Sequence, residues 1–291
     1  MEDESDVICV ADVHAVLGEG PVWVSRESAL YWLDIKGRKI FRLGRGGEVE
    51  QWETPLRVGS LAPRAGGGFI AGTEHGIAQI DLGSGRFDIV DDPEEHLPDN
   101  RFNDGKVDRS GRFWAGSMDD TEKEATGTLY RIEPGLSWTA IDEGYKVTNG
   151  PAFSPLGELM YHNDSARQVT YVFDLDGEGN ADNRRVFATY GEGEGYPDGM
   201  TVDAEGCLWI AFWEGWCVRR YSPNAQLLQT IEVPVSRPTS CAFGGSGLDR
   251  LYITSASIGL DQAALAVQPQ AGGLFVATPG VRGIAEIPFA G

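Results

Sequence analysis

The sequence predicts an all-β fold, a six-bladed β-propeller with four antiparallel strands in each blade. Three observations lead to this prediction: a short phrase recurs six times, an alternating run follows each copy, and glycine- and aspartate-rich joints separate the runs. Regular self-similarity at such a period is typical of propellers and solenoids. A β-sandwich also has many short strands, but it does not have six homologous copies.

The recurring phrase is a turn, most often with glycine, followed by an aromatic or apolar strand. Its copies lie about 38 to 49 residues apart, the spacing expected for propeller blades. The six copies are Ser28–Trp32, Gly67–Ile70, Gly111–Trp114, Gly157–Tyr161, Gly206–Trp209 and Leu248–Tyr252. Because a propeller places equivalent positions of all blades around one channel, polar residues at such a position would form a single site.

A second run follows each phrase and alternates apolar with polar residues. The runs are Lys39–Leu43, Gly76–Ile80, Thr128–Ile132, Val169–Phe173, Cys217–Tyr221 and Gly273–Val276. Alternation with a period of two predicts half-buried strands. Joints such as Asp81–Gly85 and Asp176–Gly179 suit hairpin turns. A helical turn is expected only within Gly259–Ala266.

The length of 291 residues is compatible with one closed all-β domain, and no linker or composition shift divides the chain. Eight tryptophans, twelve phenylalanines and nine tyrosines are sufficient for a core between radially packed sheets. We therefore expect a single propeller domain over residues 1–291.

The formal net charge of −20 makes nucleic acid and anionic membranes improbable partners. This negative charge either attracts a cation or belongs to acidic side chains on the solvated surface of the protein. The segment Met1–Asp6 is acidic and precedes no long apolar run, so no secretory signal is expected. The cysteines have no C-x-x-C spacing, which favours reduced core residues of a cytoplasmic protein. They are Cys9, Cys207, Cys217 and Cys241.

A set of polar residues lies ten or eleven residues before the aromatic strands. The positions are Glu19, Gly59, Asn103, Asn149, Asp198 and, with a two-residue insertion, Thr239. Four of them are carboxylates or carboxamides, and an apolar run follows each of these closely. We predict that these residues begin the innermost strand of each blade and face the channel axis.

Burying such groups without partners would cost several kcal/mol each. A hard divalent cation, which takes oxygen ligands from Asp, Glu and Asn, removes that cost. The alternative is that each residue merely forms a turn, since Asn-Gly and Asp-Gly are common turn signals. Glu19 is a weak turn former, yet it stands in the matching register, so the pattern favours a metal site.

Six runs of the sequence, three of which contain Glu19, Asn103 or Asp198, resemble signatures of the regucalcin/gluconolactonase family. They are Leu17–Trp23, Arg101–Asp108, Gly111–Met118, Pro197–Asp203, Thr239–Gly245 and Gln268–Phe275. The resemblance implies a six-bladed propeller with one catalytic divalent metal that hydrolyses lactones of sugars. It implies Glu19, Asn149 and Asp198 as metal ligands, with Asp198 also the general acid/base, and Arg101 and Asn103 as contacts to substrate.

The chain departs from the family where some members have a substrate-binding glutamate three residues after the methionine that corresponds to Met118. This position is Thr121 here, with Asp120 and Glu122 on either side. Either acid could replace the contact, or the contact is absent; we take Glu122 as the candidate substrate residue. The polar segment Asp119–Thr126 is expected to be a lid or a solvated loop.

The resulting hypothesis is a metal-dependent hydrolase that opens a sugar lactone, such as glucono-, xylono- or arabinonolactone, to its aldonic acid. The alternatives are organophosphate ester hydrolysis at the same metal, a calcium-binding regulator, and a propeller that binds protein partners. Oxygen ligands admit Ca²⁺, Mg²⁺, Mn²⁺, Zn²⁺ or Fe²⁺. We expect a monomer or weak homo-oligomer whose partner is a small sugar lactone.

Three further polar residues, His162, Asn163 and Asp164, follow Asn149 on the next predicted strand. They are expected near the channel, where a structural role is favoured over one in lining the pocket. The run Asp174–Gly179 is similar to a calcium loop, but its twelfth position is Arg185 instead of glutamate, so a hairpin turn is the better interpretation.

Overall fold

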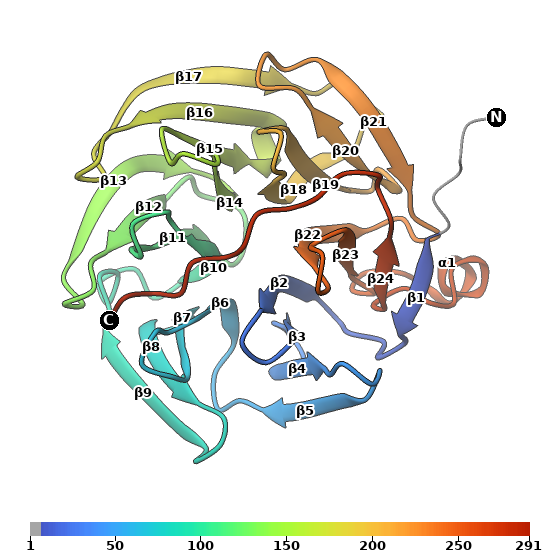
Figure 1. The fold of residues 1–291 in the computed structure, drawn as a ribbon, viewed down its shortest axis with the longest axis horizontal. Coiled ribbons are helices and arrows are strands. Elements are labelled where there is room, and N and C mark those ends of the chain that lie inside the picture. Colours follow the sequence, from blue (N-terminus) through green and yellow to red (C-terminus); the bar gives the residue numbers. More distant parts are fainter. Residues whose placement is uncertain (1–6) are drawn as a thin grey trace.

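The computed structural model describes residues 7–291, and the acidic segment Met1–Asp6 lies outside the described residues. Six four-stranded sheets are arranged in a ring around a central channel (Figure 1). All paired strands are antiparallel, and consecutive strands pair within each sheet. The predicted six-bladed β-propeller is thus confirmed.

Each blade runs from an innermost strand at the channel to an outermost strand at the rim. Blade 1 is β2 (Gly18–Val24), β3 (Ala29–Asp34), β4 (Lys39–Leu43) and β5 (Val49–Glu53), and blade 2 is β6 (Val58–Pro63), β7 (Phe69–Thr73), β8 (Gly76–Asp81) and β9 (Arg86–Asp91). Blade 3 is β10 (Asn100–Val107), β11 (Phe113–Asp119), β12 (Gly127–Ile132) and β13 (Trp138–Tyr145), and blade 4 is β14 (Thr148–Phe153), β15 (Leu159–Asp164), β16 (Val169–Leu175) and β17 (Ala181–Thr189). Blade 5 is β18 (Tyr196–Val202), β19 (Leu208–Trp213), β20 (Cys217–Tyr221) and β21 (Leu227–Glu232). The recurring phrases form the second strands and the alternating runs the third.

Blade 6 combines the two ends of the chain. Its strands are β22 (Pro238–Gly244), β23 (Arg250–Ser255), β24 (Leu274–Ala277) and, at the rim, β1 (Ile8–Ala11) from the N-terminal end. β1 pairs with β24 in the register Ile8↔Val276 and Cys9↔Phe275. The ring is therefore closed by backbone hydrogen bonds between the first and last strands. This pairing was not predicted, because β1 contains no copy of the repeat.

Burial decreases from the channel to the rim. Every residue of β6 and β14 is buried, whereas most residues of the outermost strand β17 are exposed. Large aromatic side chains fill the spaces between the sheets, and Trp114 and Trp209 are fully buried. Because the innermost strands are packed on all sides, side chains at the channel are held in fixed positions.

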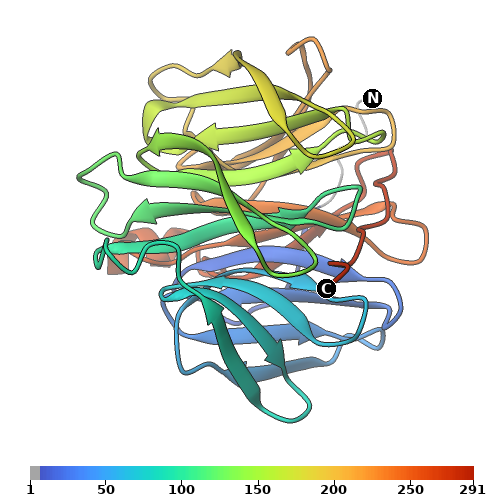
Figure 2. The ribbon, with the colours of Figure 1, turned by 90° about the vertical axis from the view of Figure 1, so that its left-hand side faces the viewer.

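Residues 279–291, which we call the C-terminal strap, cross one face of the channel as the dark red trace of Figure 1. At one end Ala204 N donates to Arg282 O (2.8 Å), and at the other Phe289 N donates to Pro63 O (2.8 Å). Phe289 is fully buried. Figure 2 shows the C-terminal end of the strap at this face of the disc. The strap thus connects opposite blades and covers the channel on this face.

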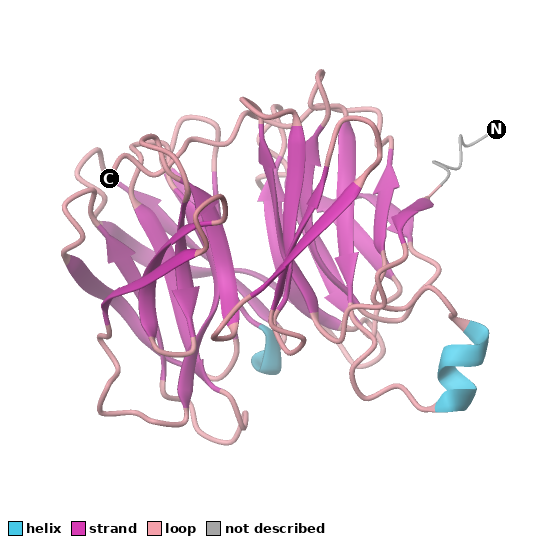
Figure 3. Ribbon diagram, turned by 90° about the horizontal axis from the view of Figure 1, so that it is seen from below, coloured by secondary structure: helices cyan, strands magenta, loops and turns pink. Residues whose placement is uncertain are grey.

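Helical structure is confined to two short segments among the described residues. α1 (Gln262–Val267) overlaps the predicted helical turn and extends one residue past it. The 3₁₀ turn Ser165–Arg167 was not predicted. Figure 3 shows both on the face opposite to the C-terminus. Neither helix of residues 7–291 has the length and apolar character needed to cross a bilayer, and all four cysteines are free.

A buried aspartate at the end of the innermost strand is repeated in blades 3 and 5. In blade 5, Asp203 accepts hydrogen bonds from Trp209 Nε1 (2.9 Å) and Arg220 Nε (2.7 Å) and from the backbone N–H of Glu205 and Cys207 (2.9 Å each). In blade 3 the equivalent residue, Asp108, accepts from Trp114 and Arg112 in the same way. This carboxylate fixes the tryptophan of the recurring phrase and the hairpin that precedes it.

We expect Asp203→Ala to lower the free energy of unfolding by about 3 to 5 kcal/mol, since it leaves Arg220 and Trp209 buried without their acceptor. Urea unfolding measures the change. The control is Asp176→Ala, which removes a carboxylate from an exposed hairpin turn and should cost far less. Equal losses from the two variants would contradict the structural role of Asp203.

Candidate functional site

The innermost strand of every blade has a β-bulge at its channel end. The register against the second strand shifts between Glu19 and Val22 in blade 1 and between Asn149 and Ala152 in blade 4. Equivalent shifts occur in β6, β10, β18 and β22. A bulge adds one unpaired residue and redirects the adjacent side chain. The six predicted ring positions therefore lie where the strand is bent at the channel.

Two of the six ring positions have structural roles. A Cβ atom at Gly59 would lie 2.3 Å from Phe102 O and 2.4 Å from Asn103 O, so no side chain fits between blades 2 and 3. The hydroxyl of Thr239 donates to Gly18 O (2.5 Å) and so connects blade 6 to blade 1. The ring is thus reduced to four polar side chains.

These four side chains line one cavity of about 550 Å³. Its wall includes Ser165 and Ala166 of the 3₁₀ turn. Figure 3 shows this turn on the face opposite to the C-terminus. All the predicted site residues border this cavity, namely Glu19, Arg101, Asn103, Glu122, Asn149 and Asp198. The structure therefore brings together residues from blades 1, 3, 4 and 5.

Hydrogen bonds orient the carboxamides of the ring. Asn103 Nδ2 donates to Thr148 O (2.7 Å) and to Asn149 Oδ1 (3.0 Å). Asn149 Nδ2 donates to Ser165 Oγ (2.8 Å), which in turn donates to Pro197 O (2.5 Å). Ser165 thereby determines which end of the Asn149 amide carries the acceptor oxygen.

The carboxylates of the ring strongly affect one another. Burial, followed by the charge of Asp104, raises the pKa of Glu19 to about 8, although the Gly20 N–H and Arg101 oppose the shift. Burial and then the charges of Glu19 and Asp104 raise the pKa of Asp198 well above its usual range. The buried carboxylates at the channel thus carry more negative charge than the hydrogen-bond donors beside them neutralise.

This donor set fits a divalent cation. Glu19, Asn149 and Asp198 offer carboxylate and carboxamide oxygens, the ligands that hard cations prefer. A cation among them would offset the burial and the mutual repulsion that raise the two pKa values. Within residues 7–291, no group of three or more His, Cys, Asp or Glu side chains is placed to hold a metal ion. The fit therefore depends on the Asn149 oxygen as third ligand.

Asp104, which follows Asn103, faces the other side of the ring. Its carboxylate accepts from Gly105 N (2.7 Å) and from Gly150 N (2.8 Å), and burial raises its pKa to about 6. It borders a separate cavity of about 20 Å³ toward the strap. Asp104 therefore fixes the bulge next to Asn149.

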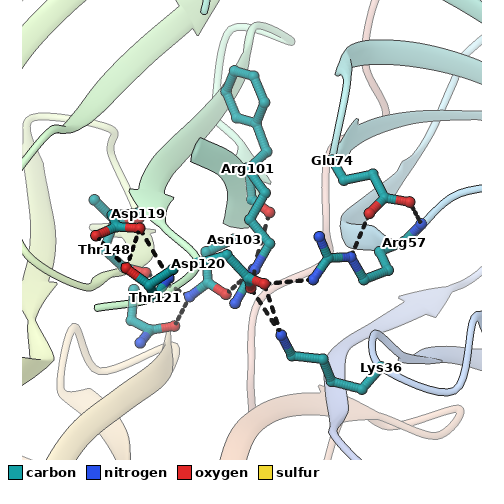
Figure 4. A network of polar contacts seen from close by, with 11 residues as sticks. Lys36, Arg57, Glu74, Arg101, Asn103, Asp119, Asp120, Thr121 and Thr148 are labelled. Carbon is teal, nitrogen blue, oxygen red and sulfur yellow. Dashed lines mark hydrogen bonds and ion pairs between the residues drawn. The ribbon is translucent and has the colours of Figure 1, made fainter. Parts of the chain in front are cut away.

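Arg101 is buried and held by acceptors in blade 3 (Figure 4). Its Nε donates to Asp120 Oδ1 (2.5 Å), and its Nη1 donates to Asn103 Oδ1 (2.7 Å) and Phe102 O (3.1 Å). The guanidinium is a planar fork of five donors. Nη2 has no hydrogen bond within the described residues and is therefore free to donate to a ligand.

Asp120 is the centre of an ion-pair network across three blades (Figure 4). Besides Arg101, it accepts from Lys36 Nζ of blade 1 (2.8 and 3.0 Å) and from Arg57 Nη1 of blade 2 (2.6 Å). Burial opposes the charged form, but these three donors outweigh it and lower the pKa of Asp120. Its oxygens are thus engaged by protein donors, among them the Arg101 guanidinium.

Glu122 also borders the cavity but, unlike that of Asp120, its side chain makes no hydrogen bond within the described residues. Thr121, at the position of the family's glutamate, donates its hydroxyl to Asp119 (2.8 Å). Asp119 also accepts from the backbone N–H of Lys123 and Glu124 (3.0 Å each). The segment after β11 is therefore an ordered turn that presents the Glu122 carboxylate to the cavity.

The three polar residues of β15 do not line the cavity. Asn163 Nδ2 donates to Asp198 O (2.6 Å), and Asp164 accepts from Lys146 N (3.1 Å). His162 is fully buried against Tyr145, and neither ring nitrogen has a partner. The structural interpretation of these residues agrees with their positions.

Several cavity residues were not predicted from the sequence. They are Lys36, Ser165, Tyr196, Trp213 and Arg237. Most lie in connections between strands or at strand ends, outside the ring register. Only Tyr196 carried a local signal, since it lies two residues before Asp198 on the same strand.

Comparisons with known proteins identify relatives over nearly the whole chain. Residues 17–257 match the family described as SMP-30/Gluconolactonase/LRE-like region. A 6-deoxy-6-sulfogluconolactonase of Pseudomonas putida is 37% identical over 285 residues, covering 97% of this chain and 98% of the relative. An L-arabinolactonase of Azospirillum brasilense is 37% identical over 290 residues, with 97% and 95% coverage.

The fold is also similar to solved structures. A crystal structure of a calcium-binding protein, regucalcin, from Agrobacterium tumefaciens superposes with a TM-score of 0.94 at 27% identity. The superposition covers 98% of this chain and 97% of that one. The sequence resemblance to the regucalcin/gluconolactonase family is thus confirmed.

The raised carboxylate pKa values predict an unusual pH dependence for the cation-free protein. Between the ordinary Glu pKa of 4.5 and the folded value of about 8, folded Glu19 binds more protons than the unfolded chain does. The free energy of unfolding should therefore fall as the pH rises through this window, by an amount on the order of a few kcal/mol.

Urea unfolding in chelator at pH 5 to 8 measures this slope. Glu19→Gln should reduce the slope and an added divalent cation should flatten it, whereas Glu192→Gln, at an exposed position, should leave it unchanged. A slope that Glu19→Gln does not alter would contradict the assignment.

Proposed function

Since this chain belongs to the SMP-30/gluconolactonase/LRE-like family, we propose that it is a metal-dependent enzyme that hydrolyses a sugar lactone to the open aldonic acid. The lactonases among its relatives support a lactone-hydrolysing activity. The observation that carries the proposal is the convergence of Glu19, Asn149 and Asp198 with Arg101 on one cavity.

The proposed metal ligands are Glu19, Asn149 and Asp198. A bound divalent cation would polarise the lactone carbonyl and lower the pKa of a water molecule. Glu19 receives a hydrogen bond from Gly20 N (2.9 Å) and Asn149 is oriented by Ser165, so both ligands are held before a cation binds. Three protein ligands leave room for water and substrate, as is typical of catalytic sites.

Asp198 is the proposed general acid/base. Its carboxylate accepts a proton from the water that attacks the carbonyl carbon, and it returns this proton to the ring oxygen as the acyl–oxygen bond breaks. One water molecule is added to the lactone, and the products are a carboxyl group and a hydroxyl group on one open chain.

Arg101, Asn103 and Glu122 are the proposed substrate contacts. The free Nη2 of Arg101 donates to a hydroxyl or to the oxygen on which negative charge develops. Glu122 accepts from sugar hydroxyls at the cavity entrance. Asn103 donates to the Asn149 amide and to Thr148 O, so it also positions a proposed metal ligand.

A second candidate function is calcium binding without catalysis. It is favoured by the similarity to regucalcin, which is described as a calcium-binding protein. The two functions differ at Asp198. In a pure calcium-binding protein Asp198→Asn changes only the affinity for calcium, whereas in a hydrolase it also removes turnover of metal-saturated protein.

The four free cysteines support a cytoplasmic location for this activity.

The first test is a panel of glucono-, xylono- and arabinonolactone assayed on metal-stripped protein restored with Ca²⁺, Mg²⁺, Mn²⁺, Zn²⁺ or Fe²⁺ in turn. We expect turnover only with an added cation. Asp198→Asn should lower kcat by about 10²- to 10⁴-fold at saturating metal, because proton transfer is lost. Asp176→Asn, which alters an exposed carboxylate of a hairpin turn away from the cavity, is the control. Full activity after complete metal removal would contradict the mechanism.

The Asp120 network gives a separate prediction. Asp120→Asn should raise KM severalfold with a smaller effect on kcat, because Arg101 loses the charged acceptor that orients it. Glu74→Gln removes the other carboxylate that binds Arg57 but leaves the contact between Asp120 and Arg101 intact. If both variants change KM equally, Asp120 does not act through Arg101.

A further inference from the structure

One side of the cavity is polar and is formed by Lys36, Arg101 and Asp120. The cavity has a second wall, which includes aromatic side chains. It consists of Tyr196 and Trp213 from blade 5, with Arg237 and Ile258 from blade 6. Tyr196 and Trp213 are directly paired across β18 and β19, so their side chains lie on the same face of the sheet. We call these two residues the aromatic wall.

The aromatic wall is partly open to solvent. Tyr196 is 43% exposed and Trp213 is half-buried, although both belong to a blade whose other inner-strand residues are buried. Ligand pockets are lined mainly by apolar and aromatic side chains, with a few polar groups that fix the orientation of the ligand. Tyr196 lies two residues before Asp198 on β18, which places the wall beside the proposed acid/base.

Arg237, which also borders the cavity, holds Trp213 in place. The Arg237 guanidinium lies 4.9 Å from the centre of the Trp213 ring, where a cation–π contact is favourable. Arg237 is itself bound by Glu214, at 2.6 Å from Nε and 2.5 Å from Nη2, and by the carbonyl of Ile258. The indole is thus fixed before any ligand enters.

The backbone around the wall is also closely packed. A Cβ atom at Gly195, whose φ is +85°, would lie 2.7 Å from Trp213 O and 2.8 Å from Gly215 Cα. The chain entering β18 therefore lies directly against the hairpin that follows Trp213. The close contact between these two backbone segments fixes the distance between Tyr196 and Trp213.

A cyclic polyol has polar hydroxyl edges and flatter C–H faces. The cavity offers a matching pair of surfaces, with charged donors and acceptors from blades 1 and 3 and aromatic rings from blade 5. We propose that Tyr196 and Trp213 bind the C–H face of the lactone ring and make the site selective for cyclic over open-chain polyols. This inference rests on the proposed function for the identity of the ligand as a sugar lactone.

The test uses Trp213→Leu with Trp216→Leu as the matched control. Trp216 lies in the same hairpin and is 43% exposed, but it does not border the cavity. Trp213→Leu should raise KM for the lactone roughly three- to tenfold, the usual value of an aromatic contact, with kcat changed less than about twofold. Trp216→Leu should match the parent protein. Tyr196→Phe, which keeps the ring, should behave as the parent does, and Tyr196→Leu should raise KM.

A binding measurement separates this inference from the lactonase proposal. The probes are 1,5-anhydroglucitol, a ring that cannot be hydrolysed, and sorbitol, its open-chain counterpart, measured by calorimetry with metal-saturated protein. We expect the parent to prefer the cyclic polyol and Trp213→Leu to lose that preference. This result would support the proposed role of the aromatic wall in binding even if the protein hydrolysed no lactone. In that case only the proposed function would be wrong.

Equal binding of the cyclic polyol by the parent and Trp213→Leu would overturn the inference. So would a fall in kcat with unchanged KM, or a parent that binds neither polyol.

Discussion

The convergence of like charges at the hub is the constraint on which the rest of the structure depends. Glu19, Asp104 and Asp198 come from three different blades and are buried within one channel. Each is offset only in part by local donors, such as Gly20 N and Gly150 N. The ring of blades holds these carboxylates together against their repulsion, and a bound cation would complete the neutralisation.

The same constraint accounts for the difference between the two faces of the disc. On one face the C-terminal strap closes the channel, and Glu286 of the strap lies 3.5 Å from Lys106, whose ammonium donates to Met200 O (3.2 Å). On the other face the cavity is bordered by the 3₁₀ turn with Ser165. A ligand therefore reaches the carboxylates from one side only, where the side chains that recognise it are also found.

Long-range ion pairing gives the cavity its specific donors. A buried guanidinium such as that of Arg101 requires an acceptor, and Asp120 supplies it while Lys36 and Arg57 hold Asp120. Of the two acids of the segment after β11 that border the cavity, Asp120 is held by these donors, whereas the Glu122 side chain makes no hydrogen bond within the described residues. The departure from the family at Thr121 thus has a structural explanation, since the Thr121 hydroxyl is used to order the turn through Asp119.

The amino-acid sequence alone determined the fold and the polar ring positions, among them Glu19, Asn149 and Asp198, because strand periodicity is local and each blade repeats the same register; the resemblance to the family then singled out these three as metal ligands. The sequence did not determine that β1 completes blade 6, since β1 carries no copy of the repeat. Nor did it indicate Ser165, Trp213 or the pairing of Lys36 with Asp120, residues 84 positions apart. These contacts join different blades through connections that do not repeat, so only the packing of the complete ring brings them together.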